Sequence, residues 1–207
     1  MGIRMESRQQ INKGGADPAS ALTGELIQAT LPAKPVEVEL IHLFDKIKAV
    51  KAFVFDVDGV LTNNDLLVTE SGELLRTMNI RDGQAIKWAV GAGFQVGIIT
   101  GGKSPGVKKR LTDLGIEEYY SGAQEKWEPF QSFLQRTNTL VSEICYMGDD
   151  MPDLPVLRKV GLSCCPADAT SEVMEICDYI SPVQGGRGCV RDIIEKVLKL
   201  QDKWPEY

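Results

Sequence analysis

From residue 51 onward, short apolar runs alternate with longer stretches in which apolar residues recur at helical spacing. Runs of this kind are typical of strands buried on both faces of a sheet. They predict strands near residues 52–56, 94–99, 118–120, 143–148, 160–164 and 178–181. Because strands alternate with helices, we expect a doubly wound parallel sheet of the Rossmann-like α/β class, with helices on both faces.

One segment departs from this alternation. Residues 66–76 contain two short apolar runs around Ser71 and Gly72, which predict a β-hairpin flap. Asp82 is expected near the N-terminus of the helix that follows. The apolar spacing predicts helices over residues 38–50, 82–90 and 190–200, the first of them packed beside the first strand.

The first 37 residues have no hydrophobic period and are rich in polar residues, Gly and Pro. They predict a mobile tail, of natural or expression-vector origin, outside a single domain of residues 38–207.

Composition narrows the classes of function. With 207 residues, 43% of them hydrophobic and 25% charged, the chain suits one globular domain with an appendage. The net charge of −6 leaves no basic face for nucleic acid, so an anionic substrate would need local positive charge or a metal ion. No apolar stretch is long enough to span a membrane, and no signal peptide is evident, so we expect a cytoplasmic protein.

The cysteines and the single histidine argue against disulfides and against a zinc site. Five cysteines lack Cys-x-x-Cys spacing, and the adjacent Cys164 and Cys165 are poor disulfide partners, which indicates reduced thiols. A zinc site is not expected, because His42 is the only histidine.

The ends of three predicted strands carry chemically useful side chains. Asp56 and Asp58 follow the first strand, and alternation along a strand would place them on one side, about 7 Å apart. Thr100 and Asp149 close two later strands, and Lys126 lies between them. Ligands bind at the carboxyl ends of open parallel sheets, which favours a site here. Taken singly, each feature is equally typical of a turn, a helix cap or a solvated charge.

Together, in this order, the motifs resemble those of the haloacid dehalogenase superfamily of phosphotransferases. The resemblance covers residues 51–207 and consists of Asp-x-Asp-Gly at Asp56, the strand-end Thr100, Lys126, and Gly-Asp-Asp-x-x-Asp at residues 148–153. Members of this superfamily usually insert a large cap domain. The intervals from Asp58 to Thr100 and from Lys126 to Asp149 leave no room for one, so the chain resembles the capless branch.

The resemblance implies a role for each motif residue. Asp56 would attack phosphorus and form an aspartyl-phosphate intermediate, and Asp58 would act as general acid and then as general base. Mg²⁺ would be held by the Asp56 carboxylate, the Asp58 backbone carbonyl and Asp149.

The remaining motif residues would bind the phosphoryl group. The Thr100 hydroxyl and the amides of Val57 and Gly101 would hold its oxygens, while Lys126 neutralises charge. Asp150 and Asp153 are expected to orient Lys126 or a metal-bound water.

Two further segments bear on the substrate. Residues 79–83 (Asn-Ile-Arg-Asp-Gly) and the glycine-rich residues 185–191 resemble those of 3-deoxy-D-manno-octulosonate 8-phosphate phosphatases. Arg81 and Arg187 are therefore candidates for binding the sugar acid, with an exposed helix start and a flexible turn as alternatives. The pattern departs from the family at Gly102, where relatives often carry Arg, and at Met78, which replaces the usual Phe.

Other functions stay open at this level. A nonulosonate 9-phosphate is a second candidate substrate. A non-catalytic regulatory domain that partners a cytidylyltransferase is an alternative of another class, although retention of Asp58 argues against it. Similar capless phosphatases form tetramers through their hairpins, which implies a homotetramer here; a monomer is the alternative, against which the apolar hairpin residues Leu66, Leu67 and Val68 argue.

Overall fold

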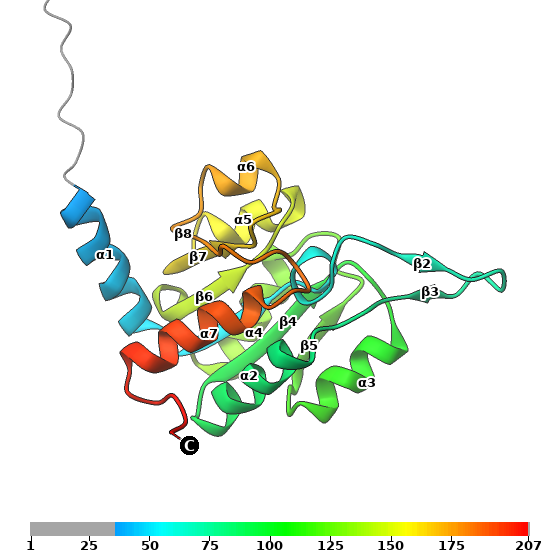
Figure 1. Cartoon of the computed structure of the whole chain (residues 1–207), viewed down its shortest axis with the longest axis horizontal. Helices are drawn as coiled ribbons and strands as arrows, with labels where there is room; N and C mark the ends of the chain where they lie inside the picture. Colours follow the sequence, from blue (N-terminus) through cyan, green and yellow to red (C-terminus); the bar gives the residue numbers. More distant parts are fainter. Residues whose placement is uncertain (1–35, 207) are drawn as a thin grey trace, which may run out of the picture. The chain divides into compact units, whose positions relative to one another are not determined.

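The computed structural model describes residues 36–206, so the predicted tail at residues 1–37 lies almost wholly outside the described part. Six parallel strands form one sheet in the order β5-β4-β1-β6-β7-β8 (Figure 1). The strands are β1 (Ala52–Phe55), β4 (Gln95–Thr100), β5 (Glu118–Ser121), β6 (Ile144–Met147), β7 (Leu162–Cys165) and β8 (Tyr179–Ile180). Each overlaps one of the six predicted strands, and the doubly wound α/β fold is confirmed.

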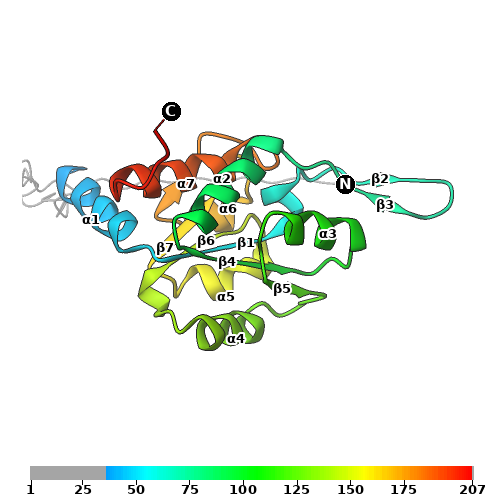
Figure 2. The ribbon, with the colours of Figure 1, turned by 90° about the horizontal axis from the view of Figure 1, so that it is seen from below.

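Helices cover both faces of this sheet (Figure 2). Buried side chains of α2 (Ile80–Gly91), α3 (Pro105–Asp113) and α7 (Cys189–Leu200) share one apolar cluster with the sheet. Those of α4 (Trp127–Thr137), α5 (Leu154–Leu157) and α6 (Ser171–Met174) share a second cluster. The sheet thus separates two cores, as the continuous apolar runs of its strands require.

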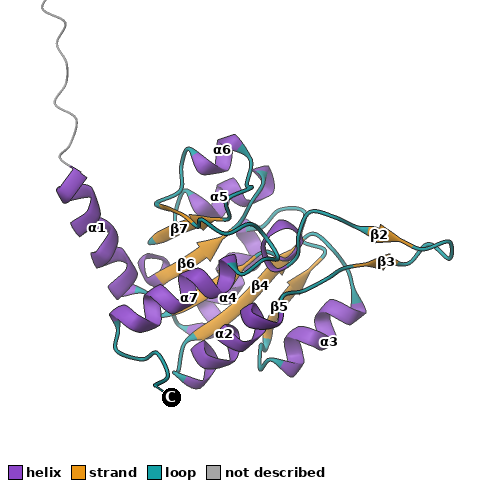
Figure 3. Cartoon of the chain, viewed as in Figure 1, coloured by secondary structure: helices purple, strands orange, loops and turns teal. Residues whose placement is uncertain are grey.

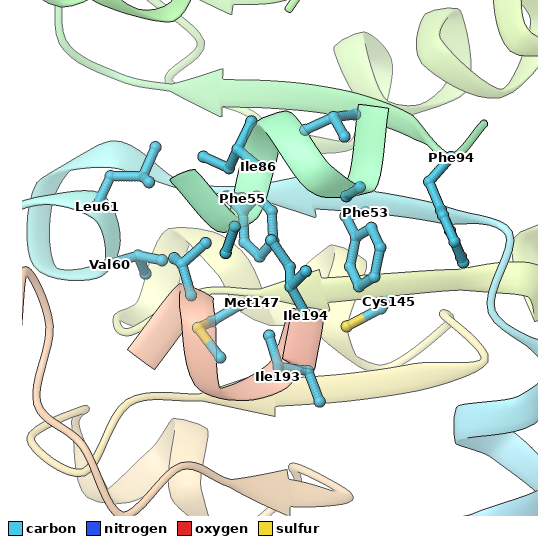
Figure 4. Close-up of a cluster of buried hydrophobic side chains, with 14 of the residues drawn as sticks. Phe53, Phe55, Val60, Leu61, Ile86, Phe94, Cys145, Met147, Ile193 and Ile194 are labelled. Carbon is cyan, nitrogen blue, oxygen red and sulfur yellow. The ribbon is translucent and has the colours of Figure 1, made fainter. Parts of the chain in front are cut away.

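Strand β1 shows how the sequence supplies both cores. Phe53 and Phe55 enter the cluster beneath α2 and α7, while Ala52 and Val54 enter the opposite one. Figure 4 shows Phe55 beside Ile86 of α2, and Phe53 between Phe55 and Phe94. The rings of Phe53 and Phe55 are fully buried, and each such side chain contributes about 1.5–3 kcal/mol of hydrophobic stabilisation. This packing holds the end of β1, where the first motif lies, in a rigid position.

The N-terminal helix contributes Ile47 to the buried cluster that contains Phe53 and Phe55 of β1, and it also packs on the C-terminal helix. Helix α1 (Val36–Ala49) contacts α7 and the turn before β6. The Gln201 side chain, just after α7, donates hydrogen bonds to the carbonyls of Lys48 (3.1 Å) and Val50 (2.8 Å). The helix is therefore attached at the C-terminal helix, a long-range contact that helical spacing alone does not reveal.

The hairpin extends away from the sheet (Figure 3). Its strands β2 (Leu67–Val68) and β3 (Leu74–Leu75) pair only with each other in an antiparallel register. The chain between the first two motifs consists of this hairpin, α2 and β4, and the chain from Lys126 to Asp149 of α4, a short turn and β6. Neither interval of the described chain holds a large cap domain, as predicted. None of the helices in residues 36–206 is long and apolar enough to cross a membrane.

Candidate active site

The central strands β1, β4 and β6 bring the motif residues to one edge of the sheet. Asp56 directly follows β1, Thr100 is the last residue of β4, and Asp149 follows β6 after one glycine. Because β1 pairs with both β4 and β6, these three ends are neighbours. Asp56, Asp58, Thr100, Gly101, Lys126 and Asp149 all line one cavity of about 230 Å³.

A tight turn after β1 shapes the floor of this cavity. The Val57–Leu61 turn is closed by Thr62, whose backbone amide and hydroxyl both donate to the Val57 carbonyl, at 2.9 and 3.2 Å. Gly59 within it has φ +86°, and a Cβ atom there would lie 2.0 Å from Oδ2 of Asp149. Only glycine fits this combination of conformation and close approach. The glycine of the first motif therefore makes room for the aspartate of the last.

Lys126 links the first and last motifs. It lies just before α4, is buried, and places Nζ 2.9 Å from Oδ2 of Asp56 and 2.6 Å from Oδ1 of Asp153. The charges of Asp153 and Asp56 raise the pKa of Lys126 against the opposing effect of its burial, which is the largest single influence. Lys126 is thus held charged beside Asp56, and the expected orientation by Asp153 is present.

Asp153 is fully engaged within the protein. Its Oδ1 accepts from Lys126 and from the Tyr146 hydroxyl (2.5 Å), and its Oδ2 accepts from the amides of Asp149 (3.2 Å) and Asp150 (3.4 Å). Asp150 is exposed and caps the short turn that follows, with no contact to Lys126 in the hydrogen bonds of the described residues. Asp153 therefore holds the lysine in place. Asp150 lines the cavity, and its predicted contact with a metal-bound water stays a prediction.

A divalent cation fits the carboxylates that remain. Oxygen atoms of Asp56, Asp149 and Asp153 lie within 4.8 Å of one another. Oδ1 of Asp56 is buried and finds no hydrogen-bond partner among residues 36–206. Since both oxygens of Asp153 already accept hydrogen bonds, Asp56 and Asp149 are the carboxylates of this group best able to hold a cation. The predicted ligands, which are Asp56, the Asp58 carbonyl and Asp149, stay a prediction. Hard carboxylate oxygens suit Mg²⁺.

The electrostatics of the cavity favour the same conclusion. Burial raises the pKa of Asp56, and Lys126 opposes this rise. Burial and the neighbouring Asp153 raise the pKa of Asp149 to about 7. An ionised carboxylate in such surroundings is stabilised by a nearby cation, because the ion restores the charge balance that burial removes.

The structure adds Arg76, a site residue that the sequence reasoning missed. Arg76 follows β3 of the hairpin, and its Nε donates to Oδ1 of Asp58 at 2.5 Å while Nη2 donates to Oδ2 at 3.1 Å. This ion pair raises the pKa of Arg76. Nothing in the sequence indicated this contact, because no periodicity places the base of a hairpin over a particular turn residue.

Three predicted binding residues do not line this cavity. The Val57 side chain is buried, and the predicted contact of its amide, next to Asp56, stays a prediction. Arg81 and Arg187 line a separate hollow of about 390 Å³ beside Arg191. Within one described chain, the two arginines therefore lie together but away from Asp56.

The glycine-rich segment packs against the chain of the first motif. The Gly186 amide donates to the Val60 carbonyl (2.9 Å), and a Cβ at Gly185 would lie 1.9 Å from the Gly59 carbonyl oxygen. A flexible turn was the alternative given for this segment in the sequence. The glycines are instead required because two stretches of backbone touch here.

A parallel sheet with aspartates after its central strands and a lysine between them defines a class of phosphoryl-transferring hydrolases. A family model described as haloacid dehalogenase-like hydrolase matches residues 118–191. The 3-deoxy-D-manno-octulosonate 8-phosphate phosphatase KdsC of Salmonella typhi is 36% identical over 165 residues, which cover 80% of this chain and 88% of that protein.

Solved structures agree. The 3-deoxy-D-manno-octulosonate 8-phosphate phosphatase of Yersinia pestis superimposes with a TM-score of 0.77 at 31% identity, covering 78% of this chain and 88% of that one. The same phosphatase from Moraxella catarrhalis, in complex with a magnesium ion, a phosphate ion and KDO, gives 0.75 at 29% identity, covering 77% and 92%. The chain belongs to the haloacid dehalogenase-like hydrolases, in the family of these octulosonate 8-phosphate phosphatases.

Proposed function

We propose that this protein is a magnesium-dependent phosphatase that hydrolyses 3-deoxy-D-manno-octulosonate 8-phosphate to the free sugar acid and phosphate, in lipopolysaccharide precursor synthesis. The observation that carries the proposal is the buried pair Asp56 and Asp149 beside Lys126, with one Asp56 oxygen unpartnered in the described chain. The choice of substrate is based on the similarity to the 3-deoxy-D-manno-octulosonate 8-phosphate phosphatases named above.

The reaction proceeds in two displacements. A carboxylate oxygen of Asp56 attacks phosphorus, the bond to the sugar oxygen breaks, and Asp58 gives its proton to that oxygen. Water then attacks the aspartyl phosphate and gives a proton to Asp58, which releases phosphate and restores Asp56.

The other cavity residues are proposed to hold the phosphoryl group. Thr100 at the end of β4 lines the cavity together with Gly101, and the Thr100 hydroxyl and the Gly101 amide would bind phosphoryl oxygens. The Val57 amide, next to Asp56, would be a further donor. Lys126 neutralises charge on Asp56 and on the phosphate. Mg²⁺, held by Asp56, Asp149 and the Asp58 carbonyl, would offset the repulsion between Asp56 and the phosphate dianion.

Arg81 and Arg187 are proposed to bind the carboxylate and hydroxyls of the sugar acid. Because they lie in a hollow apart from Asp56, this role requires a neighbouring subunit's cavity or a rearranged C-terminal segment. An assembly of four chains through the hairpins would supply such a neighbour. The exposed apolar hairpin residues support it.

A cytoplasmic location is part of the proposal. All five cysteines lie in the described part of the chain, and none of them forms a disulfide. Reduced thiols are typical of that compartment.

The function is tested by phosphate release from 3-deoxy-D-manno-octulosonate 8-phosphate during a Mg²⁺ titration that starts from chelator-treated protein. We expect no turnover without the metal and saturable activation with it. Asp56→Asn should abolish turnover while its circular dichroism spectrum and unfolding midpoint stay close to those of the unaltered protein. Release of phosphate by Asp56→Asn, or at full rate in excess chelator, would contradict the proposal.

A further inference from the structure

Arg76, at the base of the hairpin, forms a bidentate ion pair with the carboxylate of Asp58 at the edge of the cavity. Two nitrogens of Arg76 meet the two oxygens of Asp58, at 2.5 and 3.1 Å. The Arg76 side chain is 10% exposed, whereas that of Asp58 is 41% exposed. The better-buried partner is therefore the arginine, so the hairpin determines where the carboxylate lies.

The guanidinium is itself fixed in place. Its Nη1 donates to the Leu74 carbonyl at 3.3 Å, which ties the group to β3. A Cβ on Gly102 would lie 3.2 Å from Asp58 Oδ2 and 3.3 Å from Arg76 Nη2. The missing side chain at Gly102 thus leaves the space in which the pair forms. Bidentate arginine–carboxylate pairs of this kind have strict geometry.

The pair also stands between two cavities. Asp58 lines the cavity of about 230 Å³ that holds the motif residues. Arg76 lines a larger hollow of about 760 Å³ beneath the hairpin, and Gly102 borders the first cavity at the same place. A substrate that extends from the first cavity into the second passes close to this pair.

We propose that Arg76 is a positioning residue for Asp58 in the acid–base steps of the proposed phosphatase reaction, on which this inference rests. When the bond between phosphorus and the sugar oxygen breaks, Asp58 gives its proton to that oxygen and becomes a carboxylate. Two N–H groups of Arg76 hold this carboxylate as it forms. The same carboxylate is then aimed at the water that attacks the aspartyl phosphate, and it takes that water's proton.

Leaving-group dependence tests this role, because poor leaving groups need a positioned acid and good ones do not. The measurement is kcat/KM, which reports formation of the aspartyl phosphate, for a series from nitrophenyl phosphate to alkyl and sugar phosphates. For Arg76→Gln we expect a loss of about 100-fold with alkyl leaving groups and under about 3-fold with nitrophenyl phosphate. Arg76→Lys keeps the positive charge but cannot form two parallel hydrogen bonds to the carboxylate. Its loss in kcat/KM with alkyl leaving groups should lie between that of Arg76→Gln and that of the unaltered protein.

Two comparisons separate positioning from a structural effect. Arg136→Gln removes an exposed arginine whose Nε contacts both Glu118 oxygens at 2.9 Å, and it should leave the whole series unchanged. In an Asp58→Asn background, Arg76→Gln should have no further effect on the leaving-group slope. Equal losses across the series, or full additivity of the two substitutions, would overturn the inference.

The outcomes also distinguish this inference from the proposed substrate. Protein that hydrolyses aryl and simple alkyl phosphates but not the octulosonate phosphate contradicts the substrate and leaves the Arg76 test intact. Protein that hydrolyses no phosphate monoester contradicts both.

Discussion

At the scale of residues, acidic side chains outnumber basic ones at the cavity. Among the described residues that line it, five are aspartates and Lys126 is the one cation; Arg76, outside the lining, pairs with Asp58. An anionic substrate entering this cavity would be repelled by it, since burial strengthens such interactions. This excess of negative charge is the physical reason why the proposed reaction depends on a metal ion.

Removal of the lysine should expose this imbalance as a loss of stability. In chelator, Lys126→Met should lower the free energy of unfolding by about 3–5 kcal/mol, because Asp56 and Asp153 lose the cation that balances their buried charge. Urea unfolding measures the change. Lys109→Met, which breaks an exposed pair with Asp113, is the matched control and should change it by less than about 1 kcal/mol. Equal effects would mean that Lys126 does not balance the carboxylates.

The glycine of the first motif offers a second test. Gly59→Ala should displace the Asp149 carboxylate and reduce metal-dependent turnover by about 100-fold or more, because a shift of this size disturbs the reacting geometry. A Mg²⁺ titration of activity measures it. Gly72→Ala at the hairpin tip is the control. Gly72 has a similar φ, +82°, and nothing lies within 4 Å of the added Cβ, so this variant introduces backbone strain without a steric clash. If both variants keep full activity, the close packing of Gly59 on Asp149 is not functional.

Residues of the site were predictable to the extent that they follow strand ends. Asp56, Thr100 and Asp149 meet because parallel strands end at one edge, a rule that needs only the apolar runs. Arg76 and Tyr146 were missed, since the first contact depends on how the hairpin folds back and the second on which face of β6 meets Asp153. No local pattern encodes either.

At the scale of elements, a buried aspartate joins two helices. Asp82 of α2 is fully buried, and its Oδ1 accepts a hydrogen bond from the Arg191 amide in the first turn of α7 at 2.7 Å. It therefore caps a helix that is distant in sequence. Its Oδ2 finds no partner in the described chain. Burial raises the pKa of Asp82 from 3.8 to about 6.

This raised pKa makes a prediction about pH. The folded protein binds the Asp82 proton more tightly than the unfolded chain does, so this group's stabilisation is lost as pH rises from about 4 to about 6. Asp82→Asn keeps an acceptor for Arg191 without the charge. Its free energy of unfolding relative to the unaltered protein should rise over this range by up to about 3 kcal/mol.

Urea unfolding at pH 4 and pH 7 measures this difference. Asp113→Asn, at an exposed position of α3, controls for the loss of one carboxylate. If the free energy of unfolding of Asp82→Asn relative to the unaltered protein stays constant or decreases from pH 4 to pH 7, the raised pKa of Asp82 is contradicted.

The elements themselves were largely predictable, whereas some of their contacts were not. Continuous apolar runs identified all six strands of the sheet, because both faces of a parallel sheet are buried. The packing of α1 on α7 and of the glycine-rich segment on the Val57–Leu61 turn depends on tertiary contacts between distant residues. Glycines in sequence suggested freedom of movement, and in the structure they allow close contact.

At the scale of the whole molecule, the hairpin presents apolar side chains that one chain does not bury. Leu67 and Val68 are 65% and 61% exposed, and Leu66, Leu74 and Leu75 on the same hairpin are exposed as well. A contiguous exposed apolar segment is typical of an interface. It supports the proposed homotetramer.

Polar substitutions on the hairpin should therefore change the assembly. Leu67→Ser with Val68→Ser is expected to shift the sedimentation coefficient from that of a tetramer to that of smaller species, because the apolar contact is lost. Leu140→Ser removes an equally exposed leucine, at 65%, outside the hairpin and should leave the tetramer unchanged. A monomeric unaltered protein, or a tetramer that persists in the double variant, would contradict assembly through the hairpin.

The most direct test of the proposed function is an internal competition. Equal amounts of 3-deoxy-D-manno-octulosonate 8-phosphate and a nonulosonate 9-phosphate are mixed with the Mg²⁺-loaded protein, and the ratio of initial product formation gives the ratio of kcat/KM. We predict that the eight-carbon acid is released in large excess and that neither is released in chelator. Preference for the nine-carbon acid would contradict the assigned substrate, and metal-independent release of both would contradict the mechanism.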